Sequence, residues 1–295
     1  MIAAFDALVE RLRATLPLAP DKPEETAEST AAALWHAAAG APVPVTRAKP
    51  PTADLDAAGV ARLEQLVGRR LGGELLGYIV GRQEFMGLEY HVGPGALIPR
   101  RETELLGMDA AEVLASILER VPRPNVLDLC TGAGNIAVAL AVRCPAARIW
   151  ATDLEADALR LAADNVRLHD VGDRVQLYQG DLFGALANAG APKFDLISCN
   201  PPYLTTKHAT HMPQEIGGGE PTAAFDGGPF GISITLRLIR EAPDYLVSGG
   251  WLCFELGAGQ GEMLEKRIRS NDRYVHCAAR TDANGTIRAL QARVA

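Results

Sequence analysis

The chain has 295 residues, which suits one large or two modest domains and is enough to bury a core. Hydrophobic residues make up 48% of it and charged residues 22%, which excludes a disordered protein, and its 29 glycines follow no period, which excludes a collagen-like one. The apolar runs are far shorter than the roughly 20 residues that span a bilayer. Charges at positions 6, 10, 11 and 13 argue against a secretory signal, so we predict a cytoplasmic protein.

The cysteines and the net charge narrow the function further. The five cysteines form no Cys-x-x-Cys pair and have no histidine at ligand spacing, so we predict reduced, mostly buried thiols and no bound metal. A formal net charge of -7 argues against a broad basic face that grips nucleic acid, although it is compatible with a local basic groove.

In chain order, the first 70 residues are predicted to be helical. Apolar residues keep helical spacing over 2–17, 25–39 and 54–70, and a connector that contains several prolines separates the second helix from the third. Residues 78–98 change character, because short runs of β-forming residues alternate with glycines there. We predict a β-hairpin for this segment.

From residue 125 onward, strand and helix patterns alternate. The predicted strands are 125–129, 148–152, 175–179, 194–199 and 251–256, and the predicted helices are 135–143, 156–168 and 233–246. This alternation predicts an α/β domain with a mostly parallel sheet. Residues 274–279 and 286–294, joined by a turn at 282–285, predict a final antiparallel pair.

The first candidate binding motif is Asp128–Asn135, which lies between a predicted strand and a predicted helix. Gly132 and Gly134 would let the backbone approach a ligand at the helix N-terminus. Such a glycine pair also serves turns that bind nothing. The third glycine of a dinucleotide fingerprint and a phosphate-binding lysine are both missing, so a pyrophosphate ligand is disfavoured.

Two acidic residues follow the next two predicted strands. Asp153 comes directly after the strand at 148–152, where a carboxylate can accept hydrogen bonds from ribose hydroxyls; the alternative is a cap for the next helix. Asp181, in Gly180–Phe183, follows the strand at 175–179 and could accept from an adenine amino group between apolar neighbours. Its alternative is a turn or cap aspartate.

The most specific motif is Asn200-Pro201-Pro202-Tyr203, directly after the strand at 194–199. The two prolines fix the loop and remove two backbone donors, which leaves the Asn200 side-chain oxygen and the Pro201 carbonyl as acceptors. Two such acceptors form a socket for a planar NH2 group, and Tyr203 offers an aromatic wall. A purely structural turn is disfavoured, because the preceding motifs lie at successive strand ends.

These motifs resemble the class I methyltransferases that use S-adenosylmethionine to methylate a planar amino nitrogen. More narrowly, the segments 76–81, 84–88, 97–100 and 102–106 resemble the HemK-like protein-(glutamine-N5) methyltransferases, and Glu220-Pro221 and Phe225–Gly228 continue the likeness. The resemblance runs from about residue 75 to the end of the chain.

The resemblance implies a Rossmann-like seven-stranded sheet with a reversed final hairpin. It also implies a helical substrate-recognition domain over residues 1–74, a β-hairpin and linker over 75–104, and a catalytic domain over 105–295. The expected cofactor is S-adenosylmethionine, with S-adenosylhomocysteine as product, and the expected enzyme is a monomer. Its substrate would be the glutamine of the Gly-Gly-Gln tripeptide in peptide chain release factors.

The site residues implied by the resemblance fall into three groups. The catalytic group is Asn200, Pro201, Pro202 and Tyr203. The cofactor group is Asp128, Cys130, Thr131, Gly132, Gly134, Asn135, Asp153, Leu154, Asp181, Leu182 and Asn200. The group that closes the site and meets the substrate is Phe85, Pro99, Arg100, Glu102 and Thr103.

Other substrates stay open at this point. Cys130, in place of a usual glycine, looks more like a sister branch that methylates a large-subunit ribosomal protein, whereas residues 76–104 look more like the release-factor branch. Arg101 and Gly217–Gly219 also depart from the family pattern, and the first 70 residues match little of it. An amino methyltransferase for DNA or RNA bases would share the socket. A non-catalytic nucleoside-binding module would not need this socket.

Overall fold

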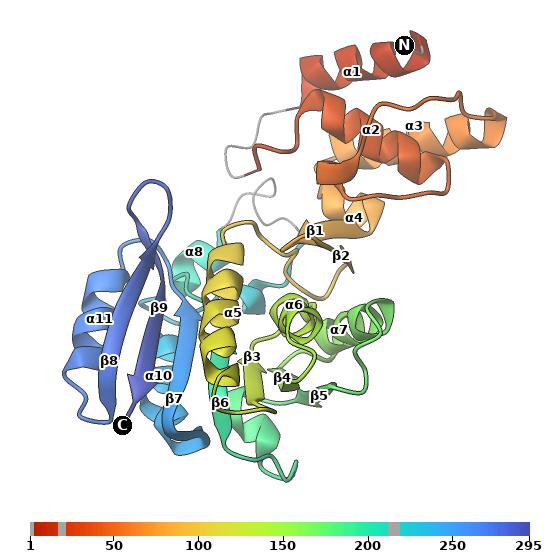
Figure 1. Ribbon diagram of the computed structural model, residues 1–295. Coiled ribbons are helices and arrows are strands. Elements are labelled where there is room, and N and C mark those ends of the chain that lie inside the picture. Colours follow the sequence, from red (N-terminus) through yellow and green to blue (C-terminus); the bar gives the residue numbers. More distant parts are fainter. Residues whose placement is uncertain (1–2, 17–21, 212–218) are drawn as a thin grey trace. The chain divides into compact units, whose positions relative to one another are not determined.

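The computed structural model describes residues 3–16, 22–211 and 219–295 (Figure 1). The chain forms two compact units: a helical unit, Met1–Pro94 with Met212–Glu220, and a sheet unit, Gly95–His211 with Pro221–Ala295. The hairpin segment belongs by its contacts to the helical unit. The three-part division at residues 74/75 and 104/105 concerns function and stays a prediction.

The helical unit begins with the three predicted helices. They are α1 (Ala3–Thr15), α2 (Ala27–Ala38) and α3 (Ala57–Leu71), with the short 3-10 helix η1 (Val45–Arg47) between the last two. The outer parts of the predicted helix 2–17, at Ile2 and residue 17, lie outside the described residues. The apolar faces of α1, α2 and α3 pack into one core, in which Leu12, Leu34 and Val67 are fully buried.

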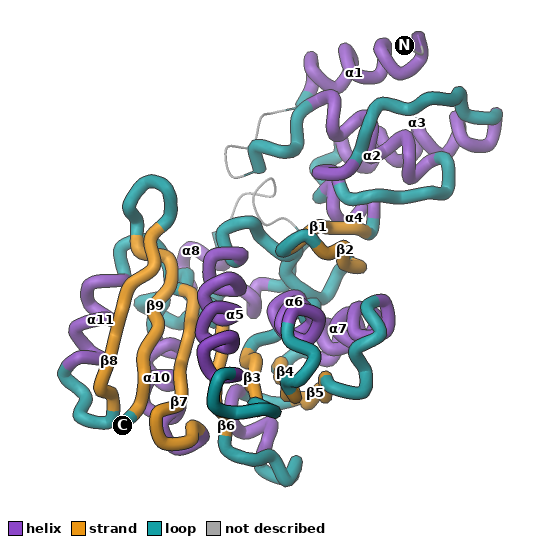
Figure 2. Tube along the Cα trace, viewed as in Figure 1, coloured by secondary structure: helices purple, strands orange, loops and turns teal. Residues whose placement is uncertain are grey.

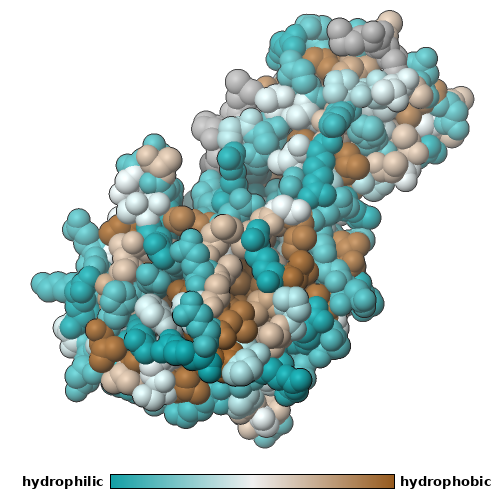
Figure 3. Space-filling model, viewed as in Figure 1, coloured by the Kyte–Doolittle hydropathy of each residue, from teal (hydrophilic) through white to brown (hydrophobic). Residues whose placement is uncertain are grey.

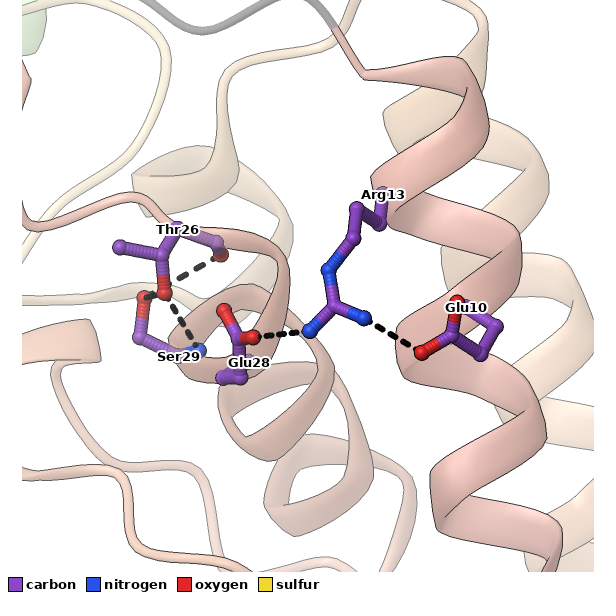
Figure 4. Close-up of polar contacts among 5 residues, drawn as sticks. All are labelled: Glu10, Arg13, Thr26, Glu28 and Ser29. Carbon is purple, nitrogen blue, oxygen red and sulfur yellow. Dashed lines mark hydrogen bonds and ion pairs between the residues drawn. The ribbon is translucent and has the colours of Figure 1, made fainter.

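Polar contacts cap the N-terminus of α2 and join α2 to α1 (Figure 4). The side chain of Thr26 accepts a hydrogen bond from the backbone N–H of Ser29 and so caps α2. Arg13 pairs with Glu10 on its own helix and with Glu28 on α2. All three charged side chains are more than half exposed, so these pairs add little to stability.

The predicted hairpin at 78–98 is shorter than expected. Residues 76–80 form a helical turn, α4 (Leu76–Val80), because Leu76, Ile79 and Val80 have helical spacing and pack into the helical core. Gly81, in the left-handed region at φ 71°, ends that turn. The hairpin itself is β1 (Arg82–Phe85) and β2 (Leu88–His91).

The sheet unit contains a seven-stranded sheet, as the resemblance implied. Its strands are β3 (Asn125–Leu129), β4 (Arg148–Asp153), β5 (Val175–Gln179), β6 (Phe194–Cys199), β7 (Leu246–Glu255), β8 (Tyr274–Thr281) and β9 (Ile287–Val294). Their order is β5-β4-β3-β6-β7-β9-β8. The first five strands of this order, β5, β4, β3, β6 and β7, are parallel to their neighbours. Strand β9 runs antiparallel to both β7 and β8, so the reversed final hairpin is confirmed.

Helices alternate with these strands along the chain and lie beside the sheet (Figure 2). They are α5 (Glu104–Leu118), α6 (Asn135–Arg143), α7 (Ala156–Leu168), α8 (Thr206–Thr210), α10 (Ser233–Tyr245) and α11 (Gly261–Arg269), with 3-10 turns η2 (Leu182–Leu186) and η3 (Thr222–Ala224). The sequence predicted α6 and α7 with these bounds. None of the described helices combines the length and apolar character needed to cross a bilayer.

The sheet unit differs from the sequence prediction mainly in three helices and one strand. Helices α5, α8 and α11 were not predicted, and the strand predicted at 251–256 begins earlier, at Leu246, where the helix predicted at 233–246 ends. The segment Ser248-Gly249-Gly250 carries little β signal, but Leu246 pairs with Phe194 at the start of β6. Pairing with a neighbouring strand therefore overrides the local preference of the sequence.

The topology places a crevice at the carboxyl ends of the central strands. After β3 the chain adds β4 and β5 on one side and then returns to place β6 on the other side of β3. Leu129, at the end of β3, pairs with Thr152 and with Cys199, so these three strands end at the same level. Ligands of open parallel sheets bind where the strand order reverses in this way.

Large apolar side chains are not confined to the cores. Polar residues cover much of the face in Figure 3, and apolar residues lie in small groups among them. The most exposed large apolar side chain is that of Phe230, at 79%, in the loop before α10. Scattered exposed residues of this kind are normal for a folded surface.

We expect the unpredicted helix α5 to depend on one buried charge. Asp109 on α5 is 2% exposed and pairs with Arg280 on β8. Arg280→Met should lower the free energy of unfolding at pH 8 by about 2 kcal/mol, because it leaves the carboxylate without its cation. The loss should shrink toward pH 5, since burial already raises the pKa of Asp109 and the folded variant takes up a proton before the unfolded chain does.

Urea unfolding at both pH values measures this effect, with exposed Glu112→Gln as the control. An equal loss at pH 8 and pH 5 would contradict the electrostatic explanation.

Candidate active site

A cavity of about 340 Å³ opens at the carboxyl ends of the central strands of the sheet unit. This volume is in the usual range for a small-molecule site. Most residues assigned to the cofactor line it: Cys130, Thr131, Gly132, Asn135, Asp153, Leu154, Asp181, Leu182 and Asn200. Three residues of the closing group, Pro99, Arg100 and Thr103, line it too, as does Pro202.

The remaining predicted site residues are not part of the cavity lining. Gly134, Pro201, Tyr203 and Glu102 belong to the same loops as residues that do line it. Phe85 belongs to the helical unit, where it is fully buried with its ring edge-to-face against Tyr90. The functional roles assigned to the site residues, whether they line the cavity or not, stay predictions.

Asp128 supports the cavity wall from behind. It is 1% exposed, and its carboxylate accepts hydrogen bonds from the hydroxyl of Thr131 at 2.6 Å and that of Ser198 at 2.7 Å. Burial raises the pKa of Asp128 to about 6, although the two hydroxyls stabilise its charge. Asp128 therefore connects β3 with β6 and holds Thr131 at the wall.

The loop after β3 needs its left-handed backbone. Cys130, Gly132 and Gly134 have φ angles of 54°, 56° and 78°. A Cβ at Gly134 would lie 3.1 Å from the Cβ of Ala162 on α7, so this glycine allows close helix packing. A Cβ at Gly132 would meet nothing within 4 Å, so the backbone of Gly132 is open to the cavity.

Asp153 connects this loop with the start of α7. Its Oδ2 accepts from the backbone N–H of Gly132 at 2.8 Å and its Oδ1 from that of Glu155 at 3.0 Å. Burial raises the pKa of Asp153, and these N–H groups oppose the shift. The side chain thus supports the helix start and also faces the cavity, and each carboxylate oxygen keeps acceptor capacity for a ligand hydroxyl.

Asp181 has a partner that the sequence did not reveal. Its carboxylate pairs with Arg237 on α10 at 2.6 Å, and its side chain is 57% exposed. The turn before it is tight, because a Cβ at Gly180 would lie 2.6 Å from the Cα of Ala185. Leu182 is buried at a φ of 47° and forms part of the cavity wall.

The Asn200–Tyr203 loop follows β6 and is held by hydrogen bonds on both sides. The Nδ2 of Asn200 donates to the hydroxyl oxygen of Thr103 at 3.2 Å, which leaves Oδ1 as the acceptor of this side chain. The carbonyl of Tyr203 accepts from Gln260 Nε2 at 3.0 Å. The loop is thus fixed before any ligand arrives.

A second loop, residues 225–231, packs against the Asn200–Tyr203 loop. The backbone N–H of Leu204 donates to the carbonyl of Phe225 at 2.8 Å, and that of Gly227 donates to the carbonyl of Leu204 at 2.8 Å. Gln260 Nε2 also donates to the carbonyl of Gly231 at 3.1 Å. The contact leaves no room for a side chain at Gly227, where a Cβ would lie 2.5 Å from the carbonyl oxygen of Pro202.

Glu255, at the end of β7, is the main residue that the sequence interpretation missed. It is 5% exposed, and the nearby hydroxyls of Thr103 and Tyr203 stabilise its charged form. Burial, the largest cause, raises its pKa to about 7. One signal was available, because a single glutamate ends the apolar run Trp251–Phe254.

The five cysteines are free thiols, and four of them are buried, which agrees with the predicted burial. Within residues 3–16, 22–211 and 219–295, no cluster of three or more His, Cys, Asp or Glu side chains could hold a metal ion.

The sheet order and the cavity at its switch point define a Rossmann-like methyltransferase, and a family model described as "Methyltransferase small domain" matches residues 107–216. Proteins named release factor glutamine methyltransferase are similar over most of the chain. The one from Geobacter sulfurreducens is 39% identical and covers 80% of this chain and 78% of its own; the one from Coxiella burnetii is 35% identical, with 82% and 83% covered. The one from Moorella thermoacetica is 36% identical, with 75% of each covered. This chain belongs to the release factor glutamine methyltransferase family, which confirms the resemblance.

We expect Gly227→Ala to impair methyl transfer by displacing the Asn200–Tyr203 loop. The added Cβ would press on the carbonyl of Pro202 and, at 2.7 Å, on that of Gly231. Turnover should fall about 10-fold or more, on the scale of a misplaced reactive group. The matched control is Gly172→Ala, whose Cβ would meet only Val166 at 3.7 Å. Equal turnover in the two variants would show that this packing does not matter for the reaction.

Proposed function

We propose that S-adenosylmethionine binds in the cavity of the sheet unit and leaves as S-adenosylhomocysteine. The residues present fit this cofactor. The open backbone at Gly132 suits close approach of the amino-acid end, Asp153 suits the ribose hydroxyls, and Asp181 with Leu182 suits the adenine. Thr152, which also lines the cavity, has a buried hydroxyl with no hydrogen-bond partner among the described residues, so the wall has unused polar capacity. The cofactor supplies an electrophilic methyl group on a sulfonium.

We further propose that the acceptor is the side-chain amide nitrogen of a glutamine. An amide nitrogen is a poor nucleophile, because its lone pair is delocalised into the carbonyl. Asn200 Oδ1 and the Pro201 carbonyl would accept both N–H hydrogens, which orients the nitrogen and favours a localised lone pair. The observation that carries this proposal is the bond from Asn200 Nδ2 to Thr103, because it directs Oδ1 away from Thr103 and keeps it as an acceptor.

We infer that the glutamine is that of the Gly-Gly-Gln tripeptide of peptide chain release factors. The relatives' names and the match over residues 76–104 support this choice. The two glycines would let the substrate backbone pass a narrow entrance, and residues 1–74 would hold the outer surface of the release factor. A net charge of -7 on the enzyme suits a free protein as substrate better than a protein within an RNA-coated ribosome, because RNA would repel the enzyme.

Several finer assignments belong to the same proposal. Pro99, Arg100, Glu102 and Thr103 would close the site around cofactor and substrate, and Tyr203 would border the entering glutamine. The enzyme would act as a monomer and without a metal. A ribosomal protein or a nucleic-acid base could use the same two acceptors, and the substrate experiment below distinguishes them.

We expect Asp153→Ala to weaken binding of S-adenosylhomocysteine about 10- to 100-fold, the loss typical of one or two hydrogen bonds to a charged group. Calorimetry measures the affinity. Asp164→Ala is the control, because Asp164 lies on the exposed side of α7 and pairs only with nearby Arg167. Absence of binding to the wild-type protein, or unchanged affinity in Asp153→Ala, would overturn the cofactor assignment.

We expect label from tritiated cofactor to enter a release factor whose Gly-Gly-Gln is intact and not one whose glutamine is replaced. Asn200→Ala should reduce turnover by about 100-fold, because it removes one of two acceptors, and should leave cofactor affinity nearly unchanged. Parallel reactions contain the large-subunit ribosomal protein and a nucleic acid. Label in the ribosomal protein alone would replace the proposed substrate, and label in nucleic acid would indicate a base methyltransferase.

A further inference from the structure

The side chain of Gln260 joins three backbone segments around the Asn200–Tyr203 loop. Gln260 is partly buried and lies in the turn between β7 and α11, where its side chain makes no capping hydrogen bond to its own helix. Its Oε1 accepts from the backbone N–H of Gly257 at 3.0 Å. Its Nε2 donates to the carbonyl of Tyr203 at 3.0 Å and to that of Gly231 at 3.1 Å. One amide thus connects the turn after β7 with the Asn200–Tyr203 loop and with the loop 225–231.

The partners of the Gln260 amide determine which way round it lies. A backbone N–H can only donate and a backbone carbonyl can only accept, so Gly257 must meet the amide oxygen and the two carbonyls must meet the NH2 group. Reversing the amide would set its NH2 against an N–H and its oxygen against two carbonyls. The side chain therefore binds the three segments in one orientation only.

Glycines let the backbone come close to this amide. An added Cβ at Gly231 would lie 2.4 Å from the carbonyl oxygen of Tyr203 and 3.2 Å from Nε2 of Gln260. An added Cβ at Gly257 would lie 3.2 Å from Cδ2 of the Tyr203 ring. Residues without a side chain at these two positions therefore allow one amide to reach all three of its partners.

The contact with Gln260 bears on one of the two acceptors proposed for the substrate amide. The carbonyl of Pro201 lies between two attachment points of its loop: Asn200 donates to Thr103 at 3.2 Å, and Tyr203 accepts from Gln260 at 3.0 Å. The two proline rings fix φ within this stretch, so few backbone torsions remain free there. Release of the Tyr203 carbonyl would free one end of the stretch and let the Pro201 carbonyl turn away from the substrate.

We propose that Gln260 is a positioning residue for methyl transfer: by holding the Tyr203 carbonyl against the loop 225–231, it keeps the Pro201 carbonyl directed at the NH2 group of the substrate glutamine. This inference rests on the proposed function, because it assumes that the Pro201 carbonyl accepts from that NH2. Gln260 is not part of the cavity lining, so it acts through the loop that it binds. Its loss should reduce turnover and leave cofactor affinity nearly unchanged.

The first variant, Gln260→Met, keeps a side chain of similar length and removes all three hydrogen bonds. Turnover with the release factor should fall about 10-fold or more, on the scale of a misplaced reactive group. The ratio of this turnover to that of the wild type should be the same at every pH, because methionine does not titrate. Calorimetry with S-adenosylhomocysteine should give an affinity within about threefold of wild type, which also shows that the variant is folded.

The second variant, Gln260→Glu, tests the direction of the hydrogen bonds. As a carboxylate, the new side chain sets its oxygens against two carbonyls, so turnover at high pH should fall at least as far as in Gln260→Met. A carboxyl that faces carbonyls takes up a proton readily, and the protonated group can donate to one of them. Turnover relative to wild type should therefore rise about threefold or more between about pH 9 and about pH 6. The titratable groups of the neighbouring segments are present in both enzymes, so their own titration cancels in this ratio; they are Tyr203, Asp226, Glu255, Glu262 and Arg288.

The matched control is Gln176→Glu, at an exposed position of the edge strand β5, which should follow the wild-type profile. Wild-type turnover in Gln260→Met, or a Gln260→Glu ratio that does not rise toward low pH, would overturn this inference alone. Cofactor affinity that falls in parallel with turnover would do the same, because it would show a general structural role. A wild-type enzyme that methylates no glutamine would overturn the proposed function as well.

Discussion

The pairing of β3 with β4 on one side and with β6 on the other is the constraint on which the site depends. The three strands end at one level, because Leu129 pairs with both Thr152 and Cys199. Gly132 and Asn200, in the loops after β3 and β6, and Asp153, at the end of β4, therefore line one cavity. A shift of register in either pair would separate the residues proposed for the cofactor from the residue proposed to receive the substrate amide.

Carboxylates in the cavity wall and behind it hold the residues that line the cavity. Asp128, behind the wall, fixes Thr131, and Asp153, in the wall, fixes the backbone of Gly132; Glu255 is buried at the end of β7. Desolvation raises the pKa of all three carboxyls, so each depends on donors supplied by its neighbours. The cavity wall is thus ordered by polar networks that compensate for the burial of charge.

The sequence interpretation was most successful where local signals and the fold agree. β3, β5, β6, α6 and α7 have the predicted bounds, because their apolar patterns are strong. It was wrong at 78–80, where β-forming side chains adopt a helical turn to reach the helical core, and at 246–250, where a glycine-rich segment joins β7 by pairing with β6. In both places a tertiary contact prevails over local preference.

The sequence by itself determined the α/β class and the order of the motifs, and it predicted two acceptors in the Asn200–Tyr203 loop, because glycine, proline and strand-end positions limit the backbone locally. Only the tertiary structure decided which groups surround those motifs. Arg237 reaches Asp181 from 56 residues away and Gln260 reaches Tyr203 from 57 residues away. No periodicity connects such residues, because their contact is created by the pairing of strands and the return of loops.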